Sequence, residues 1–417
     1  MPINSNYVYL VMIDPKNNNY KFYEMKDNGD NTFTVRYGRV GGTSASLKRY
    51  PMSKWTSTYN SKVRKGYEDQ TAYYSDQGVD TPQGQPTAEV TASREDVRKE
   101  KGETITDEQF ELWAFLKKYT KQTMQRVFTR SSEITRGMVD GSKQLVQQLY
   151  HTNDVDEFNS ILMHLMAICP RHVGVRVSRN SRGGVETWLA CDQGDFRKII
   201  DREENLIQAM ESQLAYRSKK AVSTVTGQVQ GYITDPVRTA TQEQVEVVMN
   251  HLPGDLRQRV HKVYVIEPQS QNKKFEGYCK TNAIRKTKLL WHGSRNENWL
   301  SILATSLSLN PNAVITGKMF GNGIYFAPDA HKSWGYTSSR NAYWTNENSS
   351  YAIMGLFETA YGKPLDCDCA YSYTKRYLDN CGKNCVHAHA GRSLYRDEII
   401  YYDESAMVLR YLVVFDA

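Results

Sequence analysis

The first part of the chain alternates between short apolar runs and turn-forming clusters. Three runs, VYLVMI, YKFYEM and FTVRYGRV, are separated by the clusters Pro15–Asn19 and Asp27–Asn31. Runs of this length, bounded by Asn, Asp, Gly and Pro, predict β-strands joined by turns. After Pro51, the stretch MSKWTSTYNSKVRKGY predicts a helix with Ser53 as its N-cap. We therefore expect a small β-rich domain over residues 1–74.

Apolar residues at helical spacing dominate residues 104–222. The segment Thr106–Gln109 fits a capping box, in which a threonine and a glutamine three positions later bond each other's backbone. Three stripes have helical spacing: Leu112, Trp113, Leu116 and Tyr119; Phe158, Ile161, Leu162, Leu165 and Met166; Leu206, Ile207, Met210, Leu214 and Tyr216. The second stops at Cys169-Pro170, where proline ends a helix. Such stripes predict the core of an all-α bundle rather than a cofactor site.

The segments on either side of this bundle differ from it. Residues 75–103 hold no aromatic residue and are rich in Gln, Thr, Pro and charge, which predicts a flexible linker. From about Val237 strand-like runs recur, namely HKVYVIE, KLLWHG, GIYFA, YAIMGLFE, DEIIYYD and VLRYLVVF. Short helices and loops lie between them, so we expect a third domain over residues 228–417 with mixed sheets. The whole chain is then a multidomain α+β protein.

Composition narrows the class of protein. The 417 residues are 40% hydrophobic and 24% charged, as in globular proteins. No segment approaches 18 uninterrupted apolar residues, and the beginning MPINSNYVYLVMIDP lacks the build of a signal peptide. We therefore expect an intracellular protein with no membrane partner. Seven cysteines cannot all pair, which favours reduced thiols.

Positive charge is concentrated near the N-terminus. The net charge is +7, and from Arg36 to Lys65 there are eight basic residues and no acidic one. A concentrated patch of this kind attracts polyanions, because contacts to phosphates release condensed counterions. The alternative is an ordinary solvated basic surface.

Three short segments carry the candidate chemistry. Nucleotide-binding and hydrolase motifs of the forms GxxxxGK[ST], GxSxG and HExxH are absent, and the glycines from 317 to 323 do not have GxGxxG spacing. His292 ends KLLWHG, Tyr325 lies within GIYFA, and Glu398 opens EIIYYD. Taken singly, each side chain also fits a structural or solvent-exposed residue.

Taken together, these segments resemble a known family. The order WHGS, GxGIYFA and ExxxYD is similar to the His-Tyr-Glu signature of poly(ADP-ribose) polymerases, and residues 316–338 (TGKMFGNGIYFAPDAHKSWGYTS) extend the likeness. VRYGRVGG resembles a WGR domain, with Tyr37 in place of the tryptophan that gives the domain its name. Residues 104–222 resemble the family's regulatory helical domain. The implied fold is a WGR-like domain, a helical bundle and an ADP-ribosyltransferase domain.

The resemblance implies a site for NAD+, which is the substrate. Glu398 would stabilise the cation that develops on the nicotinamide ribose, and His292 would bind a hydroxyl of the adenosine ribose. Gly293 and Ser333 would hold the nicotinamide amide, and Tyr325 and Tyr336 would stack on its ring. Ser294 and Asn298 would help on the adenosine side, and Lys332 would line the same site. Ser308 stands where an arginine commonly contacts the adenosine, which implies weaker NAD+ binding or a contact supplied elsewhere.

The resemblance also implies the partners and the activity. We expect DNA contacts from Tyr37, Arg39, Lys48, Arg49, Lys54 and Trp55. The expected function is a poly(ADP-ribose) polymerase that broken DNA stimulates, that modifies protein acceptors including itself, and that releases nicotinamide. The alternatives are a mono-ADP-ribosyltransferase and a non-catalytic nucleic-acid-binding scaffold. Such a protein would act in the nucleus of a eukaryote or in the cytoplasm and nucleoid of a bacterium.

A cysteine cluster lies ahead of Glu398. Its thiols are Cys367, Cys369, Cys381 and Cys385, and two imidazoles follow at His387 and His389. Four thiols at this spacing would suit a structural zinc ion. The alternative is a set of free thiols.

Overall fold

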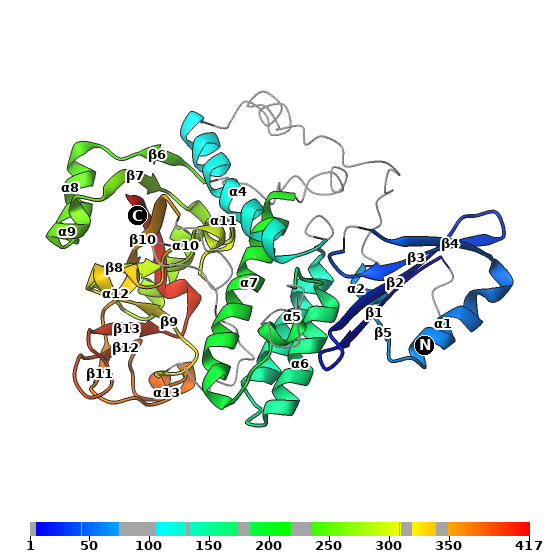
Figure 1. The fold of residues 1–417 in the computed structure, drawn as a ribbon. Helices are drawn as coiled ribbons and strands as arrows, with labels where there is room; N and C mark the ends of the chain where they lie inside the picture. Colours follow the sequence, from blue (N-terminus) through cyan, green and yellow to red (C-terminus); the bar gives the residue numbers. More distant parts are fainter. Residues whose placement is uncertain are drawn as a thin grey trace. The chain divides into compact units, whose positions relative to one another are not determined.

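The computed structural model describes residues 6–42, 44–74, 106–130, 134–173, 184–217, 235–307, 309, 319–338 and 349–417; of residues 215–217 only the backbone is described. These residues form two compact units (Figure 1). Unit 1 comprises Met1–Gln83 and Gln122–Met210, and unit 2 comprises Gly84–Lys121 and Glu211–Ala417. The expected linker, residues 75–103, and Ser308 lie outside the described residues. No helix in the described part of the chain is long and apolar enough to cross a membrane.

Unit 1 begins with a five-stranded antiparallel sheet in the order β4-β3-β2-β1-β5. Its strands are β1 (Tyr7–Asp14), β2 (Asn19–Asp27), β3 (Thr32–Arg39), β4 (Ser46–Pro51) and β5 (Glu68–Asp69). The first three confirm the expected strands. The edge strand β4 was not expected, because most of its residues are exposed and it shows no apolar alternation.

The helix after Pro51 is present, but its expected cap is wrong. A 3-10 turn (Met52–Lys54) contains Ser53, and α1 (Trp55–Val63) follows with Lys54 as its N-cap and without a side-chain cap bond. The Trp55 ring packs edge-on against Phe33 inside the sheet's core, with ring centroids 5.0 Å apart. Burial of this ring anchors α1 to the sheet.

Helices complete unit 1. They are α2 (Thr71–Tyr74), the last third of α4 (Asp107–Val127), α5 (Arg136–Leu149), α6 (Val155–Ile168) and most of α7 (Phe196–Arg217). The five apolar residues expected to form the stripe of α6 are all buried, as the helical spacing predicts. The Tyr20 hydroxyl of β2 donates to Met166 O at 2.6 Å and accepts from Arg171 N at 3.0 Å, so it joins the sheet to the end of α6.

A buried ion pair holds α7 within unit 1. Arg171 and Glu203 are 3% and 1% exposed and make two parallel hydrogen bonds, one of them 2.8 Å between Nη1 and Oε1. Arg202 adds a contact of 2.8 Å to the same carboxylate. Burial raises the pKa of Glu203, but the two guanidinium groups more than offset this, so its pKa is lowered. The carboxylate is therefore charged, and both arginines depend on it.

Replacing Glu203 with glutamine should destabilise unit 1 strongly. The change leaves Arg171 and Arg202 buried beside a neutral amide, and breaking a buried pair typically costs about 3–5 kcal/mol in the free energy of unfolding. The matched control is Asp201→Asn in the same helix, because its pair with Arg197 is about half exposed and should contribute less than about 1 kcal/mol. Urea unfolding of the full chain measures both, and equal losses in the two variants would contradict this account.

Unit 2 contains two sheets. The first has the order β6-β7-β14-β10-β8, and the second has the order β11-β12-β13-β9. The strands are β6 (Val237–Thr239), β7 (Val260–Ile266), β8 (Lys288–Gly293), β9 (Ile324–Phe326), β10 (Tyr351–Thr359), β11 (Pro364–Cys367), β12 (Cys385–Ala388), β13 (Glu398–Tyr401) and β14 (Met407–Asp416). All six expected strands are confirmed, whereas β6, β11 and β12 were missed. Mutual backbone bonds between Trp291 and Ala327, both 2.9 Å, join the two sheets where β8 passes the end of β9.

The helices of unit 2 cover these sheets. They are α8 (Gln242–Asn250), α9 (Gly254–Arg257), α10 (Gln269–Thr281), α11 (Trp299–Thr305), α12 (Ala330–Trp334), α13 (Lys375–Asn380) and the first two-thirds of α4 (Asp107–Val127). The expected capping box at the start of α4 is present, because Thr106 N donates to Gln109 Oε1 at 2.8 Å and Gln109 N donates to Thr106 Oγ1 at 3.2 Å.

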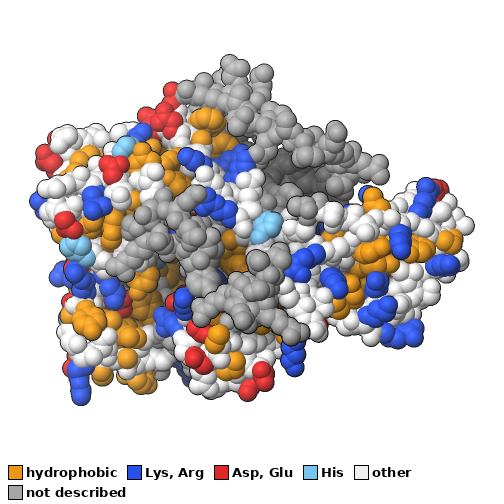
Figure 2. All heavy atoms as spheres, viewed as in Figure 1, with side chains coloured by type: hydrophobic (Ala, Val, Ile, Leu, Met, Phe, Trp, Pro, Cys, Tyr) orange, Lys and Arg blue, Asp and Glu red, His pale blue; other side chains and the backbone are white. Residues whose placement is uncertain are grey.

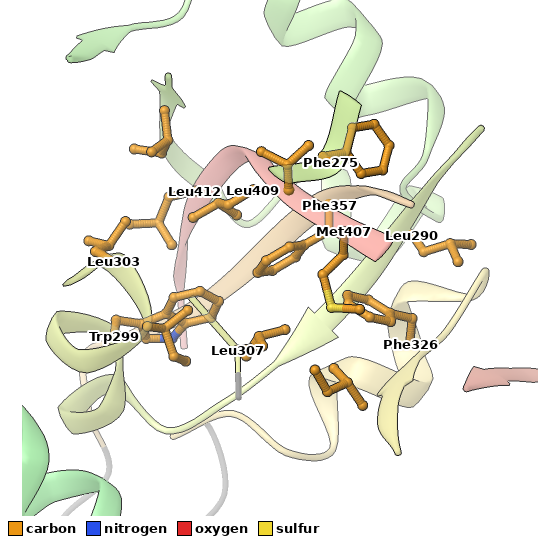
Figure 3. Packing of buried hydrophobic residues seen from close by; sticks show 14 of the residues in the cluster. Phe275, Leu290, Trp299, Leu303, Leu307, Phe326, Phe357, Met407, Leu409 and Leu412 are labelled. Carbon is orange, nitrogen blue, oxygen red and sulfur yellow. The ribbon is translucent and has the colours of Figure 1, made fainter. Parts of the chain in front are cut away.

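The largest core of unit 2 lies around the long strands β10 and β14. Figure 3 shows Phe357, Met407 and Trp299 packed with residues from several other elements. Leu112, Trp113 and Leu116 of α4 belong to the same buried cluster. The start of α4 therefore shares a core with the sheets of unit 2. Its apolar stripe packs against residues of these sheets and not against other helices alone.

Candidate active site

The meeting point of the two sheets brings His292 and Tyr325 together. His292 is the next-to-last residue of β8, and its Nδ1 lies 3.0 Å from the backbone oxygen of Tyr325 on β9. A carbonyl oxygen can only accept, so Nδ1 carries a proton, and in the neutral ring Nε2 is then the hydrogen-bond acceptor. Phe326 and Phe357 flank the imidazole, with ring centroids 5.6 and 6.0 Å away. The ring is thus held in one orientation and one tautomer.

The next residue, Gly293, lies against the backbone of α12. A Cβ at this position would collide with Ser333 O and come within 2.7 Å of Ser333 C, so no other residue fits without moving the backbone. The Ser333 hydroxyl donates to Trp291 O at 3.0 Å and is buried. The backbones of β8 at Gly293 and of α12 at Ser333 are therefore in direct van der Waals contact.

Glu398 is positioned by strand pairing. It is the first residue of β13 and is paired with Ala388 of β12. Ile399 and Ile400 pair with Phe326 and Tyr325 of β9, which puts the start of β13 beside the end of β9. Glu398 is 7% exposed, and its carboxylate lies 2.9 Å from the Lys332 ammonium of α12. The ion pair links the helix that carries Ser333 to the strand that carries Glu398.

The remaining expected site residues lie on β9, in the segment that follows β8, and just after α12. The Tyr325 hydroxyl donates to Gly321 O at 2.9 Å and accepts from Phe320 N at 3.2 Å, so its ring is fixed. Asn298 Nδ2 donates to Ser294 Oγ at 3.0 Å, and both residues are buried. Tyr336 follows α12, is 60% exposed, and donates its N–H to Ser333 O at 3.0 Å.

Two supporting groups at this site were not expected from the sequence. Trp291 supplies the carbonyl that binds Ser333 and the backbone bonds that join the sheets. Phe357 supports His292 from β10. Trp291 was visible as part of WHGS, but its role depends on backbone groups. Phe357 lies within an apolar run in which no single residue stands out.

The expected DNA-contacting residues are in unit 1, and their side chains differ in exposure and in the contacts that they make. Lys48, Arg49 and Lys54 are exposed on β4 and the turn after it. Arg39 donates instead to Asn18 O at 2.7 Å, and Arg49 also bonds Thr32 Oγ1 at 2.8 Å and pairs with Asp30. Trp55 requires a correction: its ring is 5% exposed inside the core, so it offers no face to DNA.

Tyr37 lies in a cluster of aromatic rings and lysines. It stacks with Tyr23, and the ammonium groups of Lys48 and Lys62 lie 5.8 and 5.9 Å from its ring centroid. Partial burial and the neighbouring charges of Lys65, Lys21 and Lys48 lower the pKa of Lys62. Figure 2 shows Lys and Arg side chains surrounding an apolar strip on this part of the molecule. Lys62 was not among the expected contacts.

The four cysteines ahead of Glu398 are spread over different environments. Cys385 is buried, which raises the pKa of its thiol to about 12, whereas Cys369 and Cys381 are exposed. In the described ranges, the ligand-type side chains that gather in a group of three or more are Asp366, His387 and His389, without any thiol. The expected zinc ligands are thus not the ones that the fold brings together.

Comparison with known proteins identifies two domains of this chain. Residues 242–417 match the family model of the poly(ADP-ribose) polymerase catalytic domain, and residues 7–73 match that of the WGR domain. The chain is therefore an NAD+ ADP-ribosyltransferase. It carries a poly(ADP-ribose) polymerase catalytic domain and a WGR domain.

Relatives of different lengths resemble this chain. "Putative poly [ADP-ribose] polymerase-like 100L" of Invertebrate iridescent virus 6 is 28% identical over 36% of this chain and 83% of its own length. "Uncharacterized protein 101L" of the same virus is 27% identical over 52% of this chain and 80% of its own length. "Poly [ADP-ribose] polymerase 2" of Arabidopsis thaliana is 23% identical over 85% of this chain and 60% of its own length.

Proposed function

We propose that this chain is a DNA-break-stimulated poly(ADP-ribose) polymerase that modifies protein acceptors, including itself. The observation that carries the catalytic part is the placement of Glu398, 7% exposed, beside the strand that holds Tyr325 and the helix that holds Ser333. A carboxylate that is shielded from solvent is well suited to stabilise a cation that forms during the reaction.

In the proposed reaction, the bond between the nicotinamide nitrogen and ribose C1 breaks, and nicotinamide leaves with the electron pair. A hydroxyl or carboxylate oxygen of the acceptor forms the new bond to C1. Glu398 would accept a hydrogen bond from a ribose hydroxyl and oppose the positive charge on the ribose ring. When the acceptor is the hydroxyl of an earlier ADP-ribose unit, Glu398 would also accept its proton, which is the elongation step.

The other side chains would bind and orient NAD+. His292 Nε2 is an acceptor and would receive a ribose hydroxyl of the adenosine, since Nδ1 already donates to Tyr325 O. Gly293 would present its backbone to the nicotinamide amide, with Ser333 beside it. Tyr325 and Tyr336 would stack on the pyridine ring, and the hydrogen-bonded pair Ser294 and Asn298 would lie on the adenosine side. Positioning of this kind supplies much of an enzyme's rate.

Regulation by the helical region is supported by contacts within unit 2. The Thr120 hydroxyl of α4 donates to Glu297 O at 3.0 Å, and Ser301 N of α11 donates to Ser212 Oγ of α7 at 3.1 Å. Glu297 is the neighbour of Asn298. A shift of α4 or α7 would therefore disturb the segment that holds Asn298 and Ser294. We infer that DNA bound at the WGR domain raises the rate by loosening these helices.

If DNA binds at the Tyr37 cluster, neutralising its lysines should reduce the stimulation of the transferase by DNA. In the double variant Lys48→Gln and Lys62→Gln, stimulation by broken DNA should fall while the rate without DNA stays unchanged. For each phosphate that is no longer neutralised, the slope of log affinity against log salt should become shallower by about 0.9. Lys26→Gln is the control, because Lys26 is exposed on the same sheet but outside the Tyr37 cluster. Fluorescence anisotropy with nicked DNA at several salt concentrations measures the slope.

The length of the product tests the polymerase against the alternative of single transfer. Labelled NAD+ and the full chain should give a ladder of long products on a sequencing gel. A single added unit per site would reduce the proposal to mono-ADP-ribosylation, and no turnover at all would leave a nucleic-acid-binding scaffold. The proposed place of action is with DNA, in a nucleus or a nucleoid.

A further inference from the structure

A cluster of two imidazoles and two carboxylates lies next to Glu398 and is not used by the proposed reaction. Asp366 is on β11, His387 is on β12, and His389 follows β12 directly. Asp397 immediately precedes Glu398. Strands β11 and β12 run parallel, and Asp366 pairs with His387 across them. Strand pairing therefore places these side chains on one edge of the second sheet.

The distances suit three ligands of one small ion. Asp366 Oδ1 lies 2.8 Å from His389 Nε2 and 3.8 Å from His387 Nδ1, and the three ligand atoms all lie within 4.8 Å of one another. Two atoms that each lie about 2.0–2.1 Å from a tetrahedral zinc ion are about 3.3 Å apart. The two measured distances lie about half an ångström below and above that value, so small rotations of the partly exposed Asp366 side chain bring its oxygen toward it from both nitrogens.

Asp397 provides the outer contact that metal-binding histidines usually have. Its Oδ2 lies 3.0 Å from His387 Nε2 and 3.4 Å from His389 Nδ1, the ring nitrogens that face away from Asp366. Its Oδ1 accepts from Ala390 N at 2.8 Å, which fixes the carboxylate. An imidazole that donates one N–H to a carboxylate presents the lone pair of its other nitrogen to a metal. His387 is oriented in this way, and His389 turns Nδ1 to the same carboxylate; the hydrogen bond of 2.8 Å between His389 Nε2 and Asp366 gives way when an ion binds between these two atoms.

Tyr361 supports the same tautomer for His387. Its hydroxyl lies 2.8 Å from Nδ1. With Nε2 donating to Asp397, Nδ1 accepts the Tyr361 hydroxyl, which fixes the tautomer; an ion that binds Nδ1 takes over this lone pair, and the Tyr361 hydroxyl turns away. Solvent reaches the cluster from the Asp366 side, because that side chain is 62% exposed.

We propose that Asp366, His387 and His389 bind a divalent transition-metal ion of the zinc type, with Asp397 as the outer carboxylate that orients both imidazoles. Imidazole nitrogens favour zinc over magnesium or calcium, which prefer oxygen ligands. Three protein ligands leave a fourth position for water. The ion would tie β11 to β12 beside the strand that begins with Glu398, so its role is structural and independent of the proposed transfer reaction.

Zinc uptake by the full chain tests this site directly. After treatment with a chelator and washing, equilibrium dialysis against Zn2+ should load about one ion per chain. Asp366→Asn and His389→Ala change partly exposed side chains and should each weaken zinc binding by more than about tenfold. A loss of about tenfold is the smallest that is usual when a residue that only hydrogen-bonds a metal ligand is replaced. His261→Gln is the matched control, because His261 pairs with Asp416 at 3.3 Å in an exposed His–Asp contact.

A second measurement separates this site from a thiol site. Zn2+ should raise the melting temperature of the wild type and of His261→Gln, but not of Asp366→Asn or His389→Ala. The double variant Cys369→Ser and Cys381→Ser should still bind the ion, and a Co2+-loaded protein should lack the strong near-ultraviolet band of thiolate ligands. Absence of uptake by the wild type, unchanged uptake by Asp366→Asn and His389→Ala, or uptake lost only in the cysteine variant would each overturn the proposal.

Discussion

Replacing Glu398 with glutamine should lower the turnover of NAD+ by about 10²–10³-fold, the loss typical when one preorganised electrostatic group is removed from a transition state. Glutamine keeps the size of the side chain but removes the charge that opposes the developing cation. Since Glu398 heads a strand paired with both β12 and β9, and Lys332 is partly exposed and can still donate to the amide oxygen, the fold should not change. Polymer should disappear before single transfer does, because elongation uses this carboxylate a second time.

The control for this variant is another ion-paired glutamate in the same unit. Glu358 of β10 pairs with Arg410 at 2.7 Å and lies opposite Leu289 of β8 in the strand register. Glu358→Gln should retain nearly full turnover. Steady-state release of nicotinamide measures both variants, and NAD+ binding by calorimetry separates affinity from rate. A Glu398→Gln enzyme with normal turnover would show that the carboxylate does not act on the reacting ribose.

Replacing Gly293 with alanine should abolish NAD+ binding. The added methyl group would collide with Ser333 O and lie 2.7 Å from Ser333 C, and both are backbone atoms that cannot rotate away. The collision can be relieved only if β8 and α12 separate, and this movement would displace Ser333 and Lys332 together. Overpacking of this kind also destabilises the fold, typically by about 1–3 kcal/mol. We therefore expect a large loss of affinity and a lower melting temperature.

Gly277→Ala provides the comparison. Gly277 is inside helix α10, and a Cβ there would meet nothing within 4 Å. Alanine in the interior of a helix should stabilise the protein by up to about 1 kcal/mol without affecting NAD+. Titration of NAD+ against both variants, together with thermal unfolding, distinguishes the effects. Normal NAD+ affinity in Gly293→Ala would mean that the backbone of this residue does not contact the nicotinamide.

Much of the catalytic unit could be predicted because its strands are short, strongly apolar runs bounded by turn residues. KLLWHG, GIYFA and DEIIYYD each form a strand, and pairing between β9 and β13 brings the start of one beside the end of the other. Strand β12 was missed because CVHA is short and carries a histidine. The contact between His292 and Tyr325 could not be predicted, since it runs through a backbone oxygen.

Surface assignments were harder to make from the sequence. Trp55 lies in a basic stretch and looked like a surface residue, but its ring fills the core against Phe33. Lys62 was passed over although it lies over the rings of Tyr23 and Tyr67, at 4.0 and 5.3 Å from their centroids. One-dimensional charge patterns count basic residues but do not say which of them share a face.

The residues of the metal site could not be identified from their spacing in the sequence. The cysteines stood out because their spacing is short. The cluster of Asp366 and the two histidines depends on two parallel strands that are joined by about twenty residues of chain. Parallel pairing requires such a crossover, so ligands that meet in space are separated in sequence.

The measurement that tests the central claim most directly is the rate of ADP-ribose transfer from labelled NAD+ with and without broken DNA. The full chain is incubated with nicked or blunt-ended duplex, and with an intact circular duplex as the control. The proposed mechanism predicts a faster rate and longer products with broken DNA, and little change with the intact circle. An equal rate in all three conditions would contradict regulation by DNA breaks, even if the transferase itself is active.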